Sequence, residues 1–168
     1  MSSFQSAYER MIANEGGYKL TNVAGDRGGQ TYAGIARNHW PAWAGWSDID
    51  RGDIPASELV RAFYRVNFWN AVHGDEVAAP SIASNLFDFA VNAGPRTAIK
   101  LAQIVVGVTP DGVIGPKTLV ALNNIDSSIF VAYYALAKIT RYRDIVTRDR
   151  SQSKFLLGWI NRTLREAT

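Results

Sequence analysis

The chain has 168 residues, of which 47% are hydrophobic and 20% charged, a composition that fits one folded domain or two small lobes and excludes a disordered chain. It has no cysteine and only two histidines, so a disulfide framework and a thiolate metal site are excluded, and a histidine zinc centre is not expected. The net charge of +3 mildly favours an anionic partner, but it is too small to identify one.

The first predicted element is a helix from Ser3, as its N-cap, to about Asn14. Apolar side chains recur there at the spacing of one buried helix face: Phe4, Ala7, Tyr8, Met11 and Ile12. Gly16-Gly17 ends this helix, because glycine accepts the left-handed conformation of a helix C-terminus. The glycine-rich residues 18–31 predict a loop or an irregular hairpin.

The following segments predict a short helix at 33–38 and an ordered, tryptophan-rich surface loop at 40–52. Asp53 and Pro55 then open a helix that runs to about Ala71.

The rest of the chain is predicted to be helical, and proline marks several helix starts. The expected helices begin at Pro80, Thr97, Pro116, Ser127 or Ser128, and Ser153. The sequence thus predicts a mainly α fold with at most a small β element near residues 18–32. A lobe boundary is expected near Asn92 to Pro95, and we divide the chain into residues 1–92 and 93–168. Since no flexible linker separates them, the two lobes are expected to pack together.

The residues that suggest chemistry are Glu15, Asp26 and Thr31. Cleavage of a glycosidic bond needs an acid that protonates the leaving oxygen and a carboxylate that stabilises the cationic transition state or activates water. Glu15 follows an apolar helix face, where desolvation would keep it protonated. Asp26 lies in a polar glycine-rich turn that favours its ionised form, and the Thr31 hydroxyl could position water. The spacing alone favours a solvated helix end followed by an ordinary turn, because a Glu, an Asp and a Thr often occur within such a short stretch.

Two longer motifs add a family resemblance. Glu15-Gly16-Gly17-Tyr18, followed by Asp26-x-Gly28-Gly29-x-Thr31-x-x-Gly34-Ile35, resembles the signature of glycoside hydrolase family 108, the lysozyme-like N-acetylmuramidases. Three later motifs resemble the peptidoglycan-binding region that accompanies this catalytic lobe: Asp88-x-x-Val91-Asn92-Ala93-Gly94-Pro95, Asp111-Gly112-x-x-Gly115-Pro116-x-Thr118 and Phe155-Leu156-x-Gly158-Trp159-x-Asn161-Arg162.

The resemblance implies a lysozyme-like helical fold with a small hairpin near the active site, and a helical C-terminal lobe. It implies that Glu15 is the catalytic acid and that Asp26 and Thr31 complete a Glu–Asp–Thr set. Glu15 and Asp26 are farther apart here than in many relatives, so the place of Glu15 in the pattern is the better defined. Neither a cofactor nor a metal is implied.

Aromatic and amide side chains near these motifs are candidates for substrate binding: Tyr18, Tyr32, Trp43 and Asn92. Aromatic rings stack on sugars, although they more often anchor cores and loops. Asn92 either caps the junction before Gly94 or faces the cleft, and the cap is favoured. His39 and His73 are expected to be hydrogen-bonded structural residues.

The resemblance implies hydrolysis of the β-1,4 bond between N-acetylmuramic acid and N-acetylglucosamine in peptidoglycan glycan strands. Two alternatives remain open: a lytic transglycosylase, which forms a 1,6-anhydro product, and a non-catalytic protein that binds the wall or assists secretion. The N-terminus shows no signal peptide. We therefore expect synthesis in the cytoplasm and action in the periplasm or wall, after release through a holin or by a dedicated export route. Such an enzyme would be a phage endolysin or a wall-remodelling host enzyme. A monomer that binds no nucleic acid and does not insert stably into membranes is expected.

Overall fold

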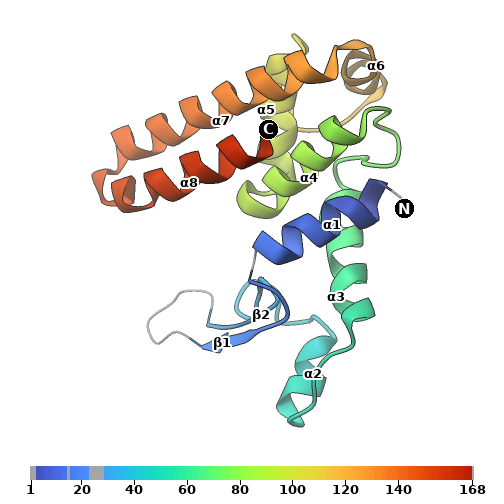
Figure 1. Cartoon of the computed structure of the whole chain (residues 1–168), viewed down its shortest axis with the longest axis vertical. Coiled ribbons are helices and arrows are strands. Elements are labelled where there is room, and N and C mark those ends of the chain that lie inside the picture. Colours follow the sequence, from blue (N-terminus) through green and yellow to red (C-terminus); the bar gives the residue numbers. More distant parts are fainter. Residues whose placement is uncertain (1–2, 15, 23–28, 168) are drawn as a thin grey trace. The chain divides into compact units, whose positions relative to one another are not determined.

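The computed structural model describes residues 3–14, 16–22 and 29–167. It contains two compact units, residues 1–71 and 72–168 (Figure 1). The chain is mainly α-helical and has one small antiparallel sheet, as the sequence predicts. The predicted lobe boundary at 92/93 lies 21 residues beyond the division at 71/72 and stays a prediction.

In the N-terminal unit, α1 spans Ser3–Asn14 and buries its predicted apolar face. The turn after it confirms the role of the two glycines. Gly16 and Gly17 have φ angles of 85° and 78°, and the N–H of Gly17 donates to the Ile12 carbonyl at 2.9 Å. A left-handed glycine pair that satisfies helix carbonyls is the usual way to end a helix.

The sheet that follows has the order β1-β2-β3, with β1 at Leu20–Asn22, β2 at Gln30–Tyr32 and β3 at Ile35–Ala36. The helix predicted at 33–38 is therefore wrong. Ala33 and Gly34 have φ angles of 50° and 81°, and these left-handed residues form the tight turn that pairs β3 with β2.

The loop predicted at 40–52 is also partly wrong, because α2 spans Gly45–Asp50. Contacts with residues outside the helix hold it in place. Asp50 accepts two hydrogen bonds from the Arg37 guanidinium, both at 2.7 Å, and the buried Trp46 donates its indole N–H to the Trp40 carbonyl at 2.8 Å.

The helix predicted from 53 to 71 is present as α3, Ser57–Tyr64, which continues into a π-helical turn, η1, at Arg65–Trp69. The core of this unit is mostly aromatic. Trp69 is fully buried and packs on Phe4, while Tyr64 packs on Tyr8 and donates its hydroxyl to the Ala33 carbonyl at 2.8 Å. These contacts join α1, the β2–β3 turn, α3 and η1.

The C-terminal unit is built from helices whose starts the sequence largely predicts. They are α4 at Pro80–Ala93, α5 at Pro95–Val105, α6 at Pro116–Asn124, α7 at Ser127–Arg148, the 3₁₀ turn η2 at Arg150–Gln152, and α8 at Ser153–Glu166 (Figure 1). Within this unit α4 packs on α5, and α7 packs on α8. The N-cap of α7 is Asp126 rather than a serine, because its carboxylate accepts the N–H groups of Ser128 and Ile129.

Among the described residues, no single helix is long and apolar enough to cross a membrane. The α6–α7 pair has the combined length and composition, but it is bent by 115°.

Candidate functional site

Two of the three predicted catalytic residues, Glu15 and Asp26, lie outside the described residues. The positions on either side of Glu15 are described. Asn14 is the last residue of α1, and Gly16 begins the turn. The third predicted residue, Thr31, is half-buried in the middle of β2, opposite Thr21 of β1 and Ala36 of β3.

The hydroxyl of Thr31 is weakly engaged. Its Oγ1 donates to the Gly29 carbonyl at 3.5 Å, which is at the outer limit of a hydrogen bond. A water molecule could therefore compete for this hydroxyl. The predicted role of Thr31 in positioning water agrees with this geometry and stays a prediction.

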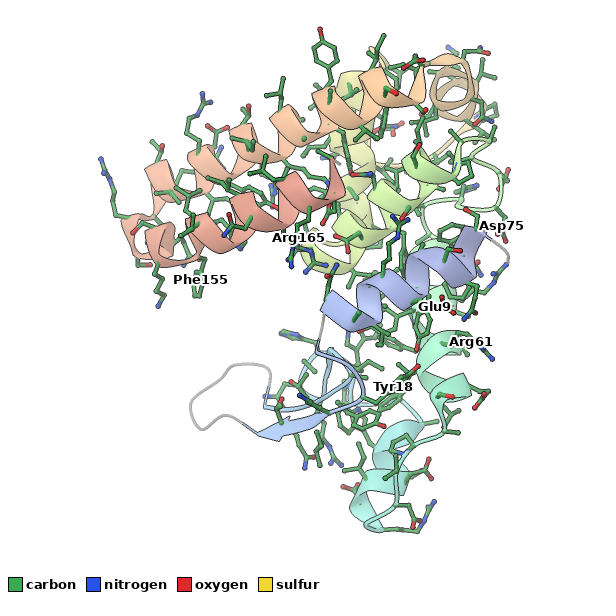
Figure 2. All side chains as sticks on the ribbon, viewed as in Figure 1. Glu9, Tyr18, Arg61, Asp75, Phe155 and Arg165 are labelled. Carbon is green, nitrogen blue, oxygen red and sulfur yellow. The ribbon has the colours of Figure 1, made fainter. Side chains whose placement is uncertain are left out.

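Tyr18 ends the Glu15-Gly16-Gly17-Tyr18 motif and is 43% exposed (Figure 2). Its hydroxyl shares a 2.9 Å hydrogen bond with the hydroxyl of Tyr8, which comes from the buried face of α1. Burial and this contact raise the pKa of Tyr8 far above its ordinary value, so the Tyr8 hydroxyl stays protonated. The core thus fixes one end of an exposed ring three residues after the predicted acid.

Tyr32 and Trp43 form a stacked pair with ring centroids 6.0 Å apart. Tyr32 is only 4% exposed, so its ring packs inside the unit, and its hydroxyl is buried without a hydrogen-bond partner among the described residues. Burial and the nearby Tyr18 raise the pKa of Tyr32. Trp43 lies so close to Gly45 that a Cβ added there would be 2.2 Å from its ring. Gly45 is therefore needed for the position of this indole.

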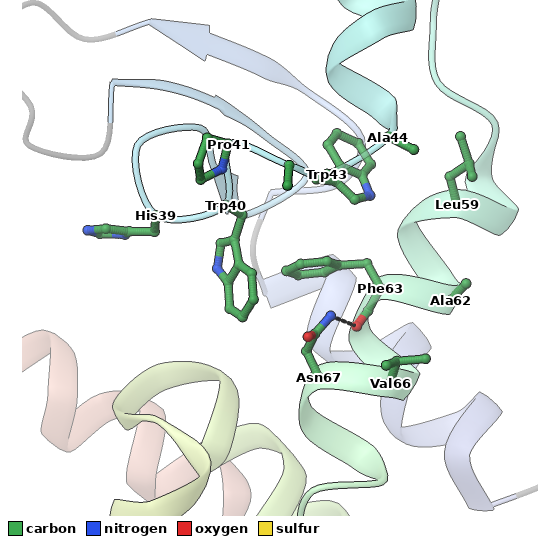
Figure 3. Close-up of a pocket in the computed structure, with 11 residues that line it drawn as sticks. His39, Trp40, Pro41, Trp43, Ala44, Leu59, Ala62, Phe63, Val66 and Asn67 are labelled. Carbon is green, nitrogen blue, oxygen red and sulfur yellow. Dashed lines mark hydrogen bonds between the residues drawn. The ribbon is translucent and has the colours of Figure 1, made fainter.

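Trp43 also lines a cavity of about 520 Å³ in the N-terminal unit (Figure 3). One wall is the segment from His39 to Ala44, and the other is formed by α3 and η1. Asn67 of η1 lies at this second wall and donates its amide N–H to the Phe63 carbonyl at 2.8 Å. The sequence predicts Trp43 as a sugar contact but gives no reason to place α3 and η1 beside it.

Asn92 belongs to the C-terminal unit, where it is exposed near the end of α4. Its amide donates to the Tyr142 hydroxyl of α7 at 3.5 Å, and the turn at Gly94 has no side-chain cap. The favoured interpretation of Asn92 as a cap is therefore wrong. Its proposed contact with substrate stays a prediction.

The Asp111-Gly112 motif of the C-terminal unit is held by Gln103, a buried side chain of α5. Its amide nitrogen donates to Asp111 Oδ1 at 2.8 Å and to the Val113 carbonyl at 2.9 Å, and its oxygen accepts the Gly112 N–H at 2.8 Å. The Gln103 contact and the backbone lower the pKa of Asp111. A cavity of about 590 Å³ is lined by this loop and the start of α6.

The other two C-terminal motifs meet in a buried ionic cluster. Arg162 of α8 donates to both oxygens of Asp88 on α4 at 3.0 Å, and Lys138 of α7 contacts Glu166 at 2.5 Å. Burial and the hydrogen bond with Asp88 raise the pKa of Glu166 to about 7 against the opposing charge of Lys138. Burial alone would raise the pKa of Asp88, but Glu166 and Arg162 hold it below its ordinary value. The motif residues Asp88 and Arg162 thus connect α4 with α8, and Lys138 adds α7 to the cluster.

Sequence analysis missed Gln103 and Lys138, because a glutamine or lysine within a helix usually faces solvent. The expected structural role of the histidines holds for His73, whose Nδ1 lies 2.6 Å from Glu76. His39 is exposed and lines the cavity described above. No group of three metal-binding side chains occurs in the part of the chain that the structure describes.

Comparisons with known proteins agree with the motifs. The model of the glycosyl hydrolase 108 family matches residues 8–94, and the model of a predicted peptidoglycan domain matches residues 97–164. Among solved structures, one titled "Structure of Brucella abortus SagA" is 31% identical in sequence. The match has a TM-score of 0.74 and covers 98% of this chain and 91% of that one. A search of curated proteins gave no match.

Proposed function

Because the chain belongs to the glycosyl hydrolase 108 family, we propose that it is an N-acetylmuramidase that hydrolyses the β-1,4 bond between N-acetylmuramic acid and N-acetylglucosamine. The coarser function is established by the two family matches: the protein is a peptidoglycan hydrolase. The observation that carries the finer proposal is that the family match includes the whole Glu15-Gly16-Gly17-Tyr18 motif.

In the proposed mechanism, Glu15 donates a proton to the oxygen of the leaving sugar. Asp26 stabilises the positive charge that develops at the anomeric carbon or assists the attacking water. Thr31 helps to place that water, which its weak contact with Gly29 supports. Tyr18 contacts the glycan with a ring whose hydroxyl is held by Tyr8. The reaction consumes one water and leaves a reducing muramic acid end.

We further propose that the enzyme acts on the wall outside the cytoplasmic membrane, because its substrate lies there. A phage endolysin released through a holin and a host enzyme that opens the wall during secretion both fit this proposal. Transcription of the gene together with a holin would support the first. Co-expression with a secretion system would support the second.

The test is digestion of purified peptidoglycan by the wild type and by Glu15→Gln, with products identified by mass spectrometry. The wild type should release fragments with reducible muramic acid ends, and Glu15→Gln should release none while keeping its circular dichroism spectrum. Reducible glucosamine ends would contradict the proposed bond. Anhydro-muramic ends would identify a lytic transglycosylase, and binding of the wall without release of fragments would identify a non-catalytic wall protein.

A further inference from the structure

We propose that the cavity between residues 39–44 and α3–η1 is a binding site for one neutral N-acetylhexosamine unit of a glycan strand. This inference rests on the proposed function only for the source of the ligand. The volume of the cavity, about 520 Å³, lies within the range of roughly 300–1,000 Å³ for small-molecule pockets. Every lining residue belongs to the N-terminal unit, so the site is complete within that unit.

The cavity combines apolar and aromatic surfaces that reach solvent. Trp40 is 37% exposed and is held edge-on against Phe63, with ring centroids 4.9 Å apart. Val66 projects from η1 on the opposite wall and is 64% exposed (Figure 3). The C–H face of a pyranose ring is apolar and packs on an indole or an aliphatic side chain. Binding is favoured when such a face covers an exposed apolar surface of this kind, because apolar area is removed from water.

The polar groups of the cavity are available for a ligand. The indole N–H groups of Trp40 and Trp43, and the amide oxygen of Asn67, have no hydrogen-bond partner among the described residues. The amide nitrogen of Asn67 is already engaged by Phe63, so its oxygen is oriented as an acceptor. Two donors and one fixed acceptor complement sugar hydroxyls and the N–H of an acetamido group.

The charge of the lining selects among sugars. None of its described residues is an aspartate, glutamate, lysine or arginine, and His39 is its only titratable side chain. A sugar that bears a free carboxylate would lose hydration here without gaining a fixed cation. An apolar helix of a partner protein would leave the indole N–H groups and the Asn67 oxygen unpaired, at a cost in free energy. A neutral acetamido sugar needs no fixed cation, and its hydroxyl and acetamido groups can pair with the indole N–H groups and the Asn67 oxygen.

The local backbone supports a ligand site. Val66 and Asn67 lie in η1, where the helix widens from α-helical to π-helical hydrogen bonding, as the Asn70 N–H bond to the Arg65 carbonyl shows. Short π-helical turns are unfavourable by themselves and occur frequently at functional sites. This turn brings the exposed valine and the amide acceptor to the same wall of the cavity.

The test is an NMR titration of the full chain carrying Glu15→Gln, so that hydrolysis does not consume the ligand. The probe is N,N′-diacetylchitobiose, and cellobiose is the matched sugar without acetamido groups. We expect the diacetylchitobiose titration to shift the indole N–H signals of Trp40 and Trp43 while those of Trp69 and Trp159 stay in place. Cellobiose should bind at least about fivefold more weakly, which is the loss of affinity expected when one hydrogen bond is missing.

Two variants locate the site. Val66→Lys places a charge on the cavity wall from an exposed position and should weaken binding at least about tenfold. Ile54→Lys is the matched control, since Ile54 is 84% exposed and lies outside the cavity, and it should leave binding unchanged. Asn67→Ser keeps a donor for the Phe63 carbonyl and removes the amide oxygen, so it should bind both disaccharides equally.

Three results would overturn the proposal: indole shifts that Val66→Lys does not reduce, equal affinity of the parent protein for the two disaccharides, or shifts that follow protein concentration rather than sugar. The last result would instead identify the cavity as a contact between two copies of the chain. These outcomes are separate from the proposed function, because cleavage of peptidoglycan at Glu15 could persist in each of them.

Discussion

Lys138 offers a sharp test of how the C-terminal unit is stabilised. Its side chain is 1% exposed, and its ammonium group contacts Glu166 and Asn85 and lies 4.8 Å and 5.1 Å from the ring centroids of Tyr134 and Phe89. The substitution Lys138→Met keeps most of the side-chain volume and removes the charge. With both carboxyls ionised, the cluster then holds two negative charges, on Asp88 and Glu166, and only the Arg162 positive charge.

The expected cost depends on pH. Removal of one partner from a buried ion pair costs about 3–5 kcal/mol, so we expect about 3 kcal/mol near pH 8, where Glu166 is ionised. The folded pKa of Glu166 is raised from 4.5 to about 7, so its contribution to stability is present below 4.5 and is lost as pH rises through about 7. Without Lys138 that pKa rises further. Near pH 5.5, Glu166 is mostly protonated with or without Lys138, so the substitution leaves no unpaired carboxylate there and the cost falls to about 1–2 kcal/mol.

The measurement is urea unfolding of the full chain at both pH values, followed by far-ultraviolet circular dichroism. Most helical residues belong to the C-terminal unit, so this signal reports mainly on that unit. Lys154→Met on the exposed side of α8 is the control and should change stability little. An equal loss for Lys138→Met at both pH values, or a similar loss for the control, would refute the electrostatic reasoning.

Four further substitutions test separate parts of the chain. Gly45→Ala should destabilise the N-terminal unit by about 1–3 kcal/mol, because the added Cβ would clash with Trp43. Gly158→Ala should stabilise the C-terminal unit by up to about 1 kcal/mol, because alanine favours the helix α8 and meets no neighbouring atom there. Thermal unfolding checks both. Gln103→Leu should cost about 2–3 kcal/mol and expose the Asp111–Gly115 loop to hydrogen exchange, and unchanged protection there would contradict the role of Gln103. Asp26→Asn should lower the rate of peptidoglycan digestion without changing the melting temperature, and full activity would assign its role to another residue.

Helices with local start signals were the most predictable part of the fold. Pro80 and Pro116 open helices as expected, and α8 begins at Ser153 as predicted. Local signals failed where contacts between distant residues decide the conformation. The β3 strand depends on the left-handed Ala33 and on pairing with β2, and α2 is held by Arg37.

The candidate site was predictable only as a pattern of residue types. The Glu15-Gly16-Gly17-Tyr18 motif identified the family, but Glu15 has a role only by resemblance. The link from Tyr18 to Tyr8 was not visible, because it joins the turn to a residue that the helical pattern assigns to the core. The amide of Asn67 was missed for a similar reason, since its place beside Trp40 depends on the packing of η1.

The most direct test of the central claim is digestion of peptidoglycan by the wild-type protein in heavy-oxygen water. Hydrolysis through Glu15 predicts that each new reducing muramic acid end carries one heavy oxygen atom and that Glu15→Gln produces no such ends. Released fragments without the label, or labelled ends formed equally by Glu15→Gln, would contradict the account.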